Sequence, residues 1–373
     1  MKTQKTVGNS LLNAASALLL GLSAGGLTGS VMADGGHGSG DYILTSLVSD
    51  QTGVARFRDT NLVNPWGILA GSEGHLIVAD NHAGVTTIYN PAGRPVPFII
   101  NVPAPDGGSG GAVTDLAMNQ SERSFLVSKG KHRDESILLF ATEDGTISGW
   151  NPEVDAHQAV IAVDNSGAGA IYKSMALAGT PRRPGLYAAN FGQGVVEIYD
   201  GGFHLVKSFT DTSLASASYA PFGVRVIGGR LLVTYAFKAS PTDGDETAGP
   251  GLGYVDEFDL AGNFVRRFAS QGMLNAPWGM ALAPRGFGKF GGALLVGNFG
   301  DGAINAYDPR SGAFLGQLSD PHGKVIQIEG LWGLAFGQGS DESSLYFTAG
   351  PDDENHGLLG VIRPDRHGHS MDH

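Results

Sequence analysis

The chain has 373 residues, a formal net charge of −12, and a composition that is 42% hydrophobic and only 16% charged. This hydrophobic content excludes a disordered protein, and 58 glycines beside so few charges favour a fold of short strands and tight turns. The acidic balance argues against nucleic-acid binding, which needs clustered Lys and Arg, and permits cation binding.

The N-terminus has the pattern of a signal peptide. Two lysines precede an apolar run from Leu11 to Leu22, and Val31-Met32-Ala33 forms a small-x-small cleavage site. The run is shorter than the roughly 20 residues of a transmembrane helix, and no later run is long enough to span a membrane. We therefore expect residues 1–33 to be removed after Ala33 and the protein to be secreted or periplasmic.

The remaining tails look irregular. Residues 34–40 have the composition of a flexible linker, and residues 365–373 form a polar, His-rich tail that we expect to be disordered. Its His367, His369 and His373 are either solvated or ligands for Zn²⁺ or Cu²⁺. Because the chain contains no cysteine, neither a lipid anchor of the lipoprotein type nor a disulfide is possible, and the core alone has to hold the fold.

Residues 41–364 contain a phrase that recurs six times. It is seen in four strong copies, Asn64-Pro65-Trp66-Gly67, Ala220-Pro221-Phe222-Gly223, Ala276-Pro277-Trp278-Gly279 and Gly330-Leu331-Trp332-Gly333. Thr114 and Lys173 take the aromatic position in two weaker copies, and the six positions are 48, 59, 49, 56 and 54 residues apart. Such a period is typical of the four-stranded blades of a β-propeller.

A strand–turn–strand hairpin follows each copy, as in Leu76 to Asn90. Two of these hairpins are stretched, one by a Pro- and Gly-rich insert at 239–252 and one by the acidic insert 352–354. The strand 42–48 has no partner nearby and would serve as the fourth strand of the last blade. The sequence therefore predicts one all-β domain, a six-bladed β-propeller closed by its N-terminal strand, which we expect to be a monomer.

The repeated phrase resembles NHL-repeat propellers. Residues 41–364 together, and Ala141 to Pro152 in particular, resemble a family of secreted bacterial six-bladed propellers known only as conserved hypothetical proteins. The resemblance implies a fold rather than a reaction. More distant six-bladed relatives include calcium-dependent lactonases and phosphotriesterases and metal-dependent lyases, but a shared fold does not transfer such chemistry.

In a propeller, the entries of the innermost strands and the hairpins after the second strands surround one end of the central channel. The residues expected there are Asn64, Asp80, Asp115, Lys173, Asn190, Tyr235, Asn275, Asn298, Asp301 and Glu329. An oxygen-rich ring suits Ca²⁺, and the candidate ligands are Asp80, Asn190, Asn298 and Glu329. The alternative is that Asn and Asp are present because hairpin turns favour them.

Two residues are candidates for acid–base catalysis, His82 and Glu143, and either can instead be an ordinary turn residue. The repeated aromatic residues belong either to the core between blades or to a stacking platform for a ligand.

Two functions remain open. The first is a binding or scaffold protein that presents its channel face to a small molecule or a protein. The second is a Ca²⁺-dependent hydrolase of lactones or esters.

Overall fold

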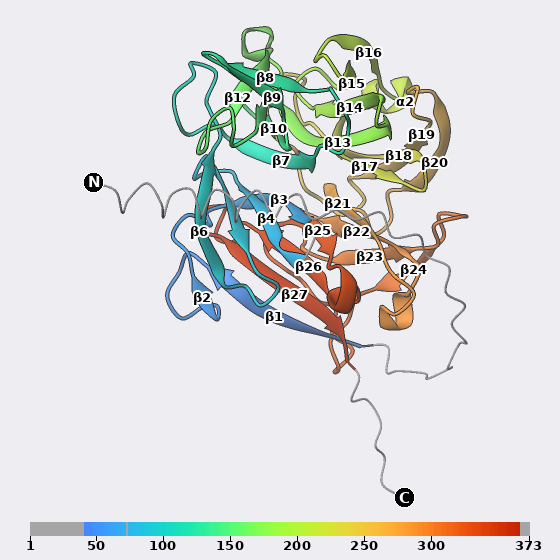
Figure 1. The fold of residues 1–373 in the computed structure, drawn as a ribbon. Helices are drawn as coiled ribbons and strands as arrows, with labels where there is room; N and C mark the ends of the chain where they lie inside the picture. Colours follow the sequence, from blue (N-terminus) through green and yellow to red (C-terminus); the bar gives the residue numbers. More distant parts are fainter. Residues whose placement is uncertain (1–40, 72–73, 366–373) are drawn as a thin grey trace, which may run out of the picture.

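Six blades of four antiparallel strands surround a central axis in the computed structural model, which describes residues 41–71 and 74–365 (Figure 1). In the sheet of the last blade, the short strand β2 (Phe57–Arg58) is added parallel to the outermost strand. The predicted six-bladed, all-β propeller is thus confirmed. The expected signal peptide, the linker 34–40 and the three tail histidines lie outside the described residues. No helix within the described ranges is long and apolar enough to cross a membrane.

The strands of each blade follow one another outward from the channel. Blades 1 and 2 are β3 (Pro65–Ala70), β4 (Leu76–Asp80), β5 (Val85–Tyr89), β6 (Pro95–Asn101), and β7 (Val113–Met118), β10 (Leu138–Thr142), β11 (Thr146–Trp150), β12 (Val160–Asp164). Blades 3 and 4 are β13 (Tyr172–Thr180), β14 (Arg183–Asn190), β15 (Val195–Asp200), β16 (Leu205–Phe209), and β17 (Tyr219–Ile227), β18 (Arg230–Phe237), β19 (Tyr254–Phe258), β20 (Phe264–Ser270). Blades 5 and 6 are β21 (Pro277–Leu282), β22 (Leu294–Asn298), β23 (Ile304–Tyr307), β24 (Phe314–Gln317), and β25 (Leu331–Phe336), β26 (Leu345–Ala349), β27 (Leu358–Pro364), β1 (Tyr42–Ser49).

A few short elements decorate this ring. They are β2 (Phe57–Arg58), the hairpin β8 (Leu126–Lys129) and β9 (His132–Glu135), the helix α2 (Thr212–Ala215), and the 3₁₀ turns η2 (Ser166–Ala168), η3 (Gly288–Phe290) and η4 (Gly339–Asp341).

Burial explains the sequence pattern of the strands. In second strands such as β4 and β22 every residue is buried, because a neighbouring blade covers each face of the sheet. Such strands are therefore continuously apolar rather than alternating. Outermost strands such as β16 and β24 are more exposed, and both begin with two exposed apolar residues, Leu205-Val206 and Phe314-Leu315.

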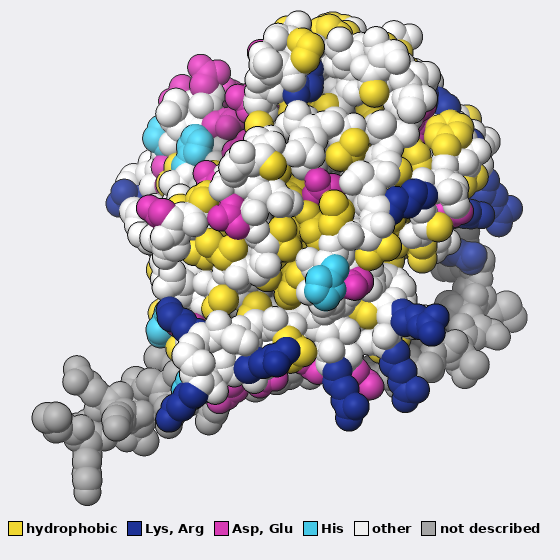
Figure 2. All heavy atoms as spheres, turned by 90° about the horizontal axis from the view of Figure 1, so that it is seen from above, with side chains coloured by type: hydrophobic (Ala, Val, Ile, Leu, Met, Phe, Trp, Pro, Cys, Tyr) yellow, Lys and Arg dark blue, Asp and Glu magenta, His cyan; other side chains and the backbone are white. Residues whose placement is uncertain are grey.

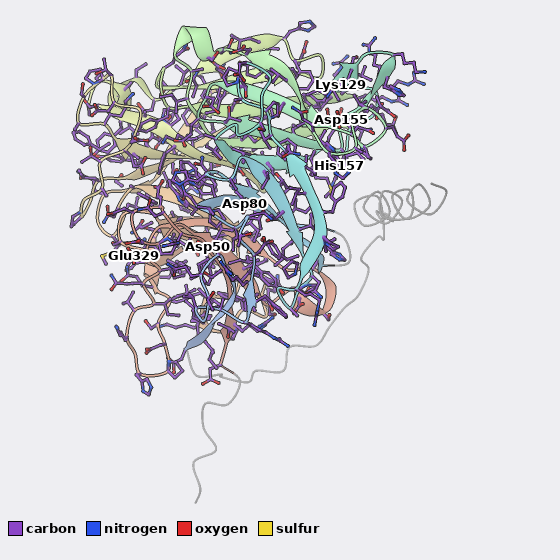
Figure 3. The ribbon with its side chains drawn as sticks, turned by 90° about the vertical axis from the view of Figure 1, so that its left-hand side faces the viewer. Asp50, Asp80, Lys129, Asp155, His157 and Glu329 are labelled. Atoms are coloured by element: carbon purple, nitrogen blue, oxygen red, sulfur yellow. The ribbon has the colours of Figure 1, made fainter. Side chains whose placement is uncertain are left out.

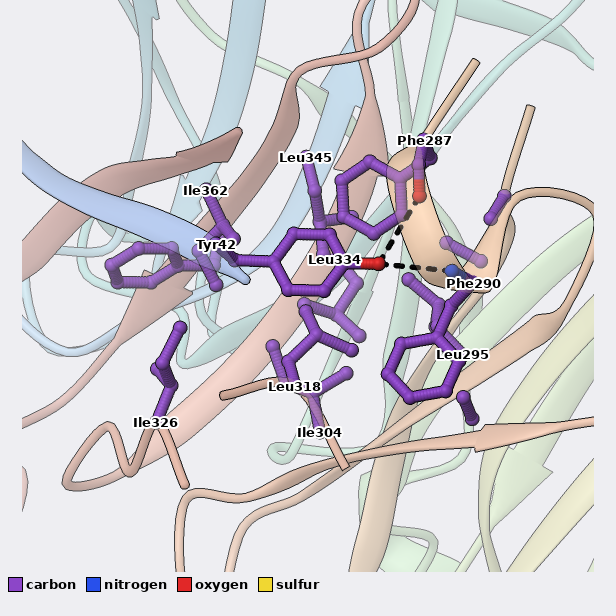
Figure 4. Packing of buried hydrophobic residues seen from close by; sticks show 14 of the residues in the cluster. Tyr42, Phe287, Phe290, Leu295, Ile304, Leu318, Ile326, Leu334, Leu345 and Ile362 are labelled. Atoms are coloured by element: carbon purple, nitrogen blue, oxygen red, sulfur yellow. Dashed lines mark hydrogen bonds between the residues drawn. The ribbon is translucent and has the colours of Figure 1, made fainter. Parts of the chain in front are cut away.

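The N-terminal strand closes the ring, as predicted. β1 pairs antiparallel with β27, from Tyr42 opposite Pro364 to Ser49 opposite Leu358. The buried Tyr42 hydroxyl donates a hydrogen bond to the Phe287 carbonyl (3.1 Å) and accepts one from the Phe290 amide (3.0 Å), in blade 5 (Figure 4). The first described strand thereby joins the last blade to its neighbour.

The repeated aromatic residues fill the middle of the ring. Trp66 stacks on Trp332 with ring centroids 3.6 Å apart, and Trp278 meets both rings edge-on. Phe222 contacts Trp332 from blade 4. Contacts between blades that are not neighbours, such as 1 with 5 and 4 with 6, place these side chains across the axis. Since none is more than 2% exposed, they are core residues and not a stacking platform, and they form an aromatic plug in the channel.

The Tyr42 hydroxyl gives a direct test of ring closure. Tyr42→Phe leaves the Phe287 carbonyl and Phe290 amide without their partner and should lower the free energy of unfolding by about 1–3 kcal/mol. Ile43→Ala, at a 45% exposed neighbouring position, should change it by less than about 0.5 kcal/mol. Urea denaturation of the three proteins measures the difference, and equal effects of the two substitutions would argue against closure through Tyr42.

Candidate functional site

Three of the expected metal ligands occupy equivalent positions in three blades. Asp80, Asn190 and Asn298 are the last residues of β4, β14 and β22 and are fully buried. Asp80 accepts a hydrogen bond from the Thr87 hydroxyl (2.7 Å), and Asn190 donates one to Glu197 (3.0 Å). Each bond joins the second strand of a blade to the third, so these side chains brace their own hairpins and are not brought together.

The fourth expected ligand, Glu329, is exposed and lies well apart from Asp80 (Figure 3). Within residues 41–71 and 74–365, no group of three or more His, Asp or Glu side chains is arranged to hold a metal ion. Calcium binding therefore stays a prediction. Burial raises the pKa of Asp80 well above its ordinary value.

Other predicted mouth residues have separate positions. Tyr235 packs in the core of blade 4, and Asp115 lies inside the channel wall, where it forms an ion pair with Arg225 (2.7 Å). Asp301 is exposed and accepts a hydrogen bond from Asn298 within its own hairpin. His82 is an exposed turn residue.

Lys173 is the centre of the site that does form. It takes the aromatic position of the repeat in blade 3, at the end of the channel where the innermost strands begin, and its side chain is 1% exposed. Its ammonium contacts carboxylates of Glu143 (2.6 Å), Asp245 (2.9 Å) and Glu246 (3.8 Å). Below these, it lies 5.1 Å from the centre of the Trp66 ring, on the aromatic plug.

The two inserts complete this group of side chains. Asp245 and Glu246 belong to the first insert (residues 239–252), and the second insert (residues 352–354) supplies Glu354. We call Glu143, Lys173, Asp245, Glu246 and Glu354 the mouth cluster. The sequence predicted Glu143 and Lys173 but not the other three carboxylates.

Three residues that the sequence did predict at the mouth hold the inserts in place. The side-chain oxygen of Asn275 accepts a hydrogen bond from the Gly249 amide (2.7 Å) in the first insert. Glu329 accepts one from the Asp352 amide (3.1 Å), and Asn64 donates one to the Glu354 carboxylate (2.8 Å). They therefore position the inserts that carry the acidic side chains.

The second insert adopts an unusual backbone. Asp352, Asp353 and Glu354 have backbone φ values of 58°, 49° and 65°. These are left-handed conformations that residues other than glycine rarely adopt. Each costs on the order of 1 kcal/mol, and such residues concentrate at functional sites. The strain is maintained at the place where Glu354 enters the mouth cluster.

The electrostatics of the cluster follow from burial and close charges. Burial alone lowers the pKa of Lys173, but the charges of Glu143, Glu246 and Asp245 outweigh it and raise that pKa. Burial, reinforced by the charges of Glu246 and Glu143, raises the pKa of Glu354 to about 7. Burial also raises the pKa of Glu246, against the opposing effect of Lys173. The mouth therefore holds a fixed ammonium group and a carboxyl group that titrates near neutral pH.

Sequence comparison finds viral relatives. The uncharacterized protein R648 of Acanthamoeba polyphaga mimivirus is 34% identical over 331 residues, which cover 87% of this chain and 80% of R648. The uncharacterized protein L690 of the same virus is 31% identical, over 86% of this chain and 85% of L690. No family model matches the chain. The expected resemblance to bacterial secreted proteins and to NHL repeats is not confirmed by these matches.

Solved propeller enzymes share the fold at low sequence identity. An α-L-arabinofuranosidase of Fusarium graminearum, in complex with arabinobiose, has a TM-score of 0.54 and 12% identity, over 87% of this chain and 98% of that chain. The gluconolactonase XC5397 of Xanthomonas campestris has a TM-score of 0.51 and 14% identity, over 88% and 92% of the two chains. Virginiamycin B lyase of Staphylococcus aureus has a TM-score of 0.51 and 13% identity, over 87% and 99%. At these identities the likeness concerns the fold alone.

Replacing the buried ammonium group tests the cluster. Lys173→Met leaves Glu143 and Glu246 without their cation and should lower the free energy of unfolding at pH 8 by about 3–5 kcal/mol. The loss should be smaller at pH 5, where the unpaired carboxylates take up protons. Because the pKa of Lys173 is raised, its ammonium group contributes fully to stability at pH values below its ordinary pKa, as long as its partner carboxylates are ionised, and this contribution is lost only in stronger alkali.

A matched control is Lys129→Met. Its ion pair with Asp155 is equally short (2.6 Å), but Lys129 is 54% exposed (Figure 3). Chemical denaturation at both pH values should show a change of about 1 kcal/mol or less for this variant. A similar small effect of Lys173→Met would mean that the mouth cluster does not depend on Lys173.

Proposed function

This chain belongs to the same family as the mimivirus proteins R648 and L690, which are uncharacterized and suggest no function for it. From the geometry of the chain itself, we propose that it binds a small cation at the acidic mouth of the channel. The observation that carries the proposal is the mouth cluster, in which four carboxyl groups face one buried ammonium group. Lys173 already shows how this place accommodates positive charge, between carboxylates and an aromatic ring.

The charge balance favours a cation over an anion. Besides Lys173, the nearby cation is Lys238, whose pKa is lowered by burial and by the charge of Lys173, although Asp243 opposes this. The exposed carboxylates Asp352 and Asp353 add further negative charge at the second insert. An anionic ligand would meet this excess of carboxylates, whereas a cation would relieve the repulsion that raises the pKa of Glu354.

The exposed fractions of the side chains show which members of the mouth cluster are buried in ion pairs and which are accessible to a ligand. Lys173 and Glu246 have side chains that are 1% and 5% exposed and are already paired. Asp245 is 84% exposed and Glu143 is 24% exposed. We place the ligand above Lys173, against Asp245, Glu143 and Glu354. Together with the predicted signal peptide, this makes the protein an exported binding propeller.

The affinity for a cation should depend on the ionisation of Glu354. With a pKa of about 7, the carboxylate fraction rises from about one tenth at pH 6 to about nine tenths at pH 8. We expect Ca²⁺ or spermidine to bind about tenfold more tightly at pH 8 than at pH 6. Separate calorimetric titrations with the two cations measure this difference. Glu354→Gln should remove this pH dependence.

Asp308→Asn is the control for net charge, because Asp308 is an exposed carboxylate in a turn of blade 5 whose role as acceptor an amide can retain. It should leave the pH dependence intact. Since the raised pKa means that ionisation of Glu354 costs stability as the pH rises, Glu354→Gln should also raise the melting temperature at pH 8 more than at pH 5. Absence of binding by both cations at pH 8 would refute the proposal.

A second candidate is hydrolysis of a lactone or ester, dependent on calcium or not. One observation favours it: a carboxyl group that titrates near pH 7 can donate and accept a proton under neutral conditions. In this case Glu354 would be the proton donor, and Glu143, held by Lys173 and Asn81, the ionised partner.

Metal analysis separates the two versions of this candidate. Mass spectrometry of the purified mature protein, with melting curves before and after EGTA, should show about one calcium and a lower melting temperature if a resident Ca²⁺ is required. A metal-free protein with an unchanged melt would exclude the calcium-dependent hydrolase. A lactone and ester screen, with Glu354→Gln as the inactive control, then tests hydrolysis itself.

A further inference from the structure

A cavity lies between blades 4 and 5, at the opposite end of the innermost strands from the mouth cluster. It has a volume of about 480 Å³ and is formed where the innermost strands β17 and β21 end and their turns begin. Its walls are mostly apolar and include Leu232, Phe268 and Leu294. A cavity of this size and character falls within the range of small-molecule sites in proteins.

Three arginines surround this apolar cavity. Arg230 and Arg266 contact the carboxylate of Glu257 at 3.5 and 2.7 Å, and Arg285 makes no hydrogen bond or ion pair with any other residue that the structure describes. One carboxylate thus faces three guanidinium groups. The lining retains an excess of positive charge although the whole chain is acidic.

The rim of the cavity combines apolar and cationic side chains. Figure 2 views the ring from its edge, and Lys and Arg side chains lie along the lower margin of that view, with some Asp and Glu side chains among them. At the rim, Leu282 is 47% exposed although it ends an otherwise buried strand. An exposed leucine beside an unpaired guanidinium group offers an apolar and a cationic contact at the same place.

We propose that this cavity, which we call the arginine cleft, binds an amphiphilic anion: an apolar body that ends in one carboxylate or sulfonate group. The apolar body would lie against Phe268, Leu282 and Leu294. The anionic group would lie at Arg285 and Arg230, where guanidinium groups suit the planar, bidentate recognition of a carboxylate. The opposite charges of the arginine cleft and the mouth cluster mean that the two sites select different ligands.

The probe for this proposal is 8-anilinonaphthalene-1-sulfonate, compared with N-phenyl-1-naphthylamine, which has a similar apolar body without the sulfonate. Fluorescence titration of the folded full-length mature chain should give one sulfonate site with at least tenfold higher affinity than the neutral compound. Added NaCl should weaken the binding of the sulfonate only, because salt screens the arginines.

Two half-exposed leucines provide matched variants. Leu282→Glu introduces a carboxylate at the rim of the cleft and should weaken sulfonate binding at least tenfold. Leu205→Glu, at a 54% exposed position on β16, adds the same charge elsewhere and should change it less than twofold. Arg285→Ala, which removes no hydrogen bond or ion pair within the described residues, should weaken sulfonate binding several-fold.

Unchanged melting temperatures would verify that each variant is folded. Equal effects of the two Glu substitutions, or equal affinities for the charged and neutral probes, would overturn the proposal. Loss of sulfonate binding in Glu354→Gln, a variant of the mouth cluster, would also overturn it, because the arginine cleft is a separate site.

Discussion

The structure depends on the closure of the ring around a buried aromatic centre. A protein without cysteine has no covalent link between its first and last strands, so the pairing of β1 with β27 and the Tyr42 hydroxyl bonds make that connection. Closure completes the last blade with strands from both ends of the chain and holds the innermost strands around the axis, where Trp66, Trp278 and Trp332 meet.

The aromatic plug also determines where chemistry can take place. Because the tryptophans occupy the channel, a ligand cannot pass along it and is restricted to the ends of the channel or the clefts between blades. Lys173 and Thr114 stand in place of an aromatic residue at two of the six repeat positions, and Lys173 puts a buried charge at the end of the plug. The inserts then bring the carboxylates that a buried ammonium group requires.

The two proposed sites carry net charges of opposite sign. In the mouth cluster, carboxylates exceed ammonium groups and the pKa of Glu354 is raised. In the arginine cleft, guanidinium groups exceed carboxylates next to apolar walls. Both sites arise where a regular blade is interrupted or where two blades diverge, since the regular strands themselves are covered on both faces.

The sequence by itself determined the number of blades, their strand order and the closing role of strand 42–48, because a period near 50 residues and continuously apolar strands have few other solutions. It also predicted Asn64, Lys173, Asn275 and Glu329 at the mouth. Only the tertiary structure decided what these residues do. Asp80 and Asn190 form hydrogen bonds with the third strands of their own blades, and Asn298 donates one to the Met273 carbonyl ahead of β21 and one to Asp301 in its own hairpin turn. Asp245 and Glu246 contact Lys173 from an insert that follows no repeat, and Glu354 comes from a second insert, where Asn64 holds it. The conformation of such irregular loops is set by contacts distant in sequence.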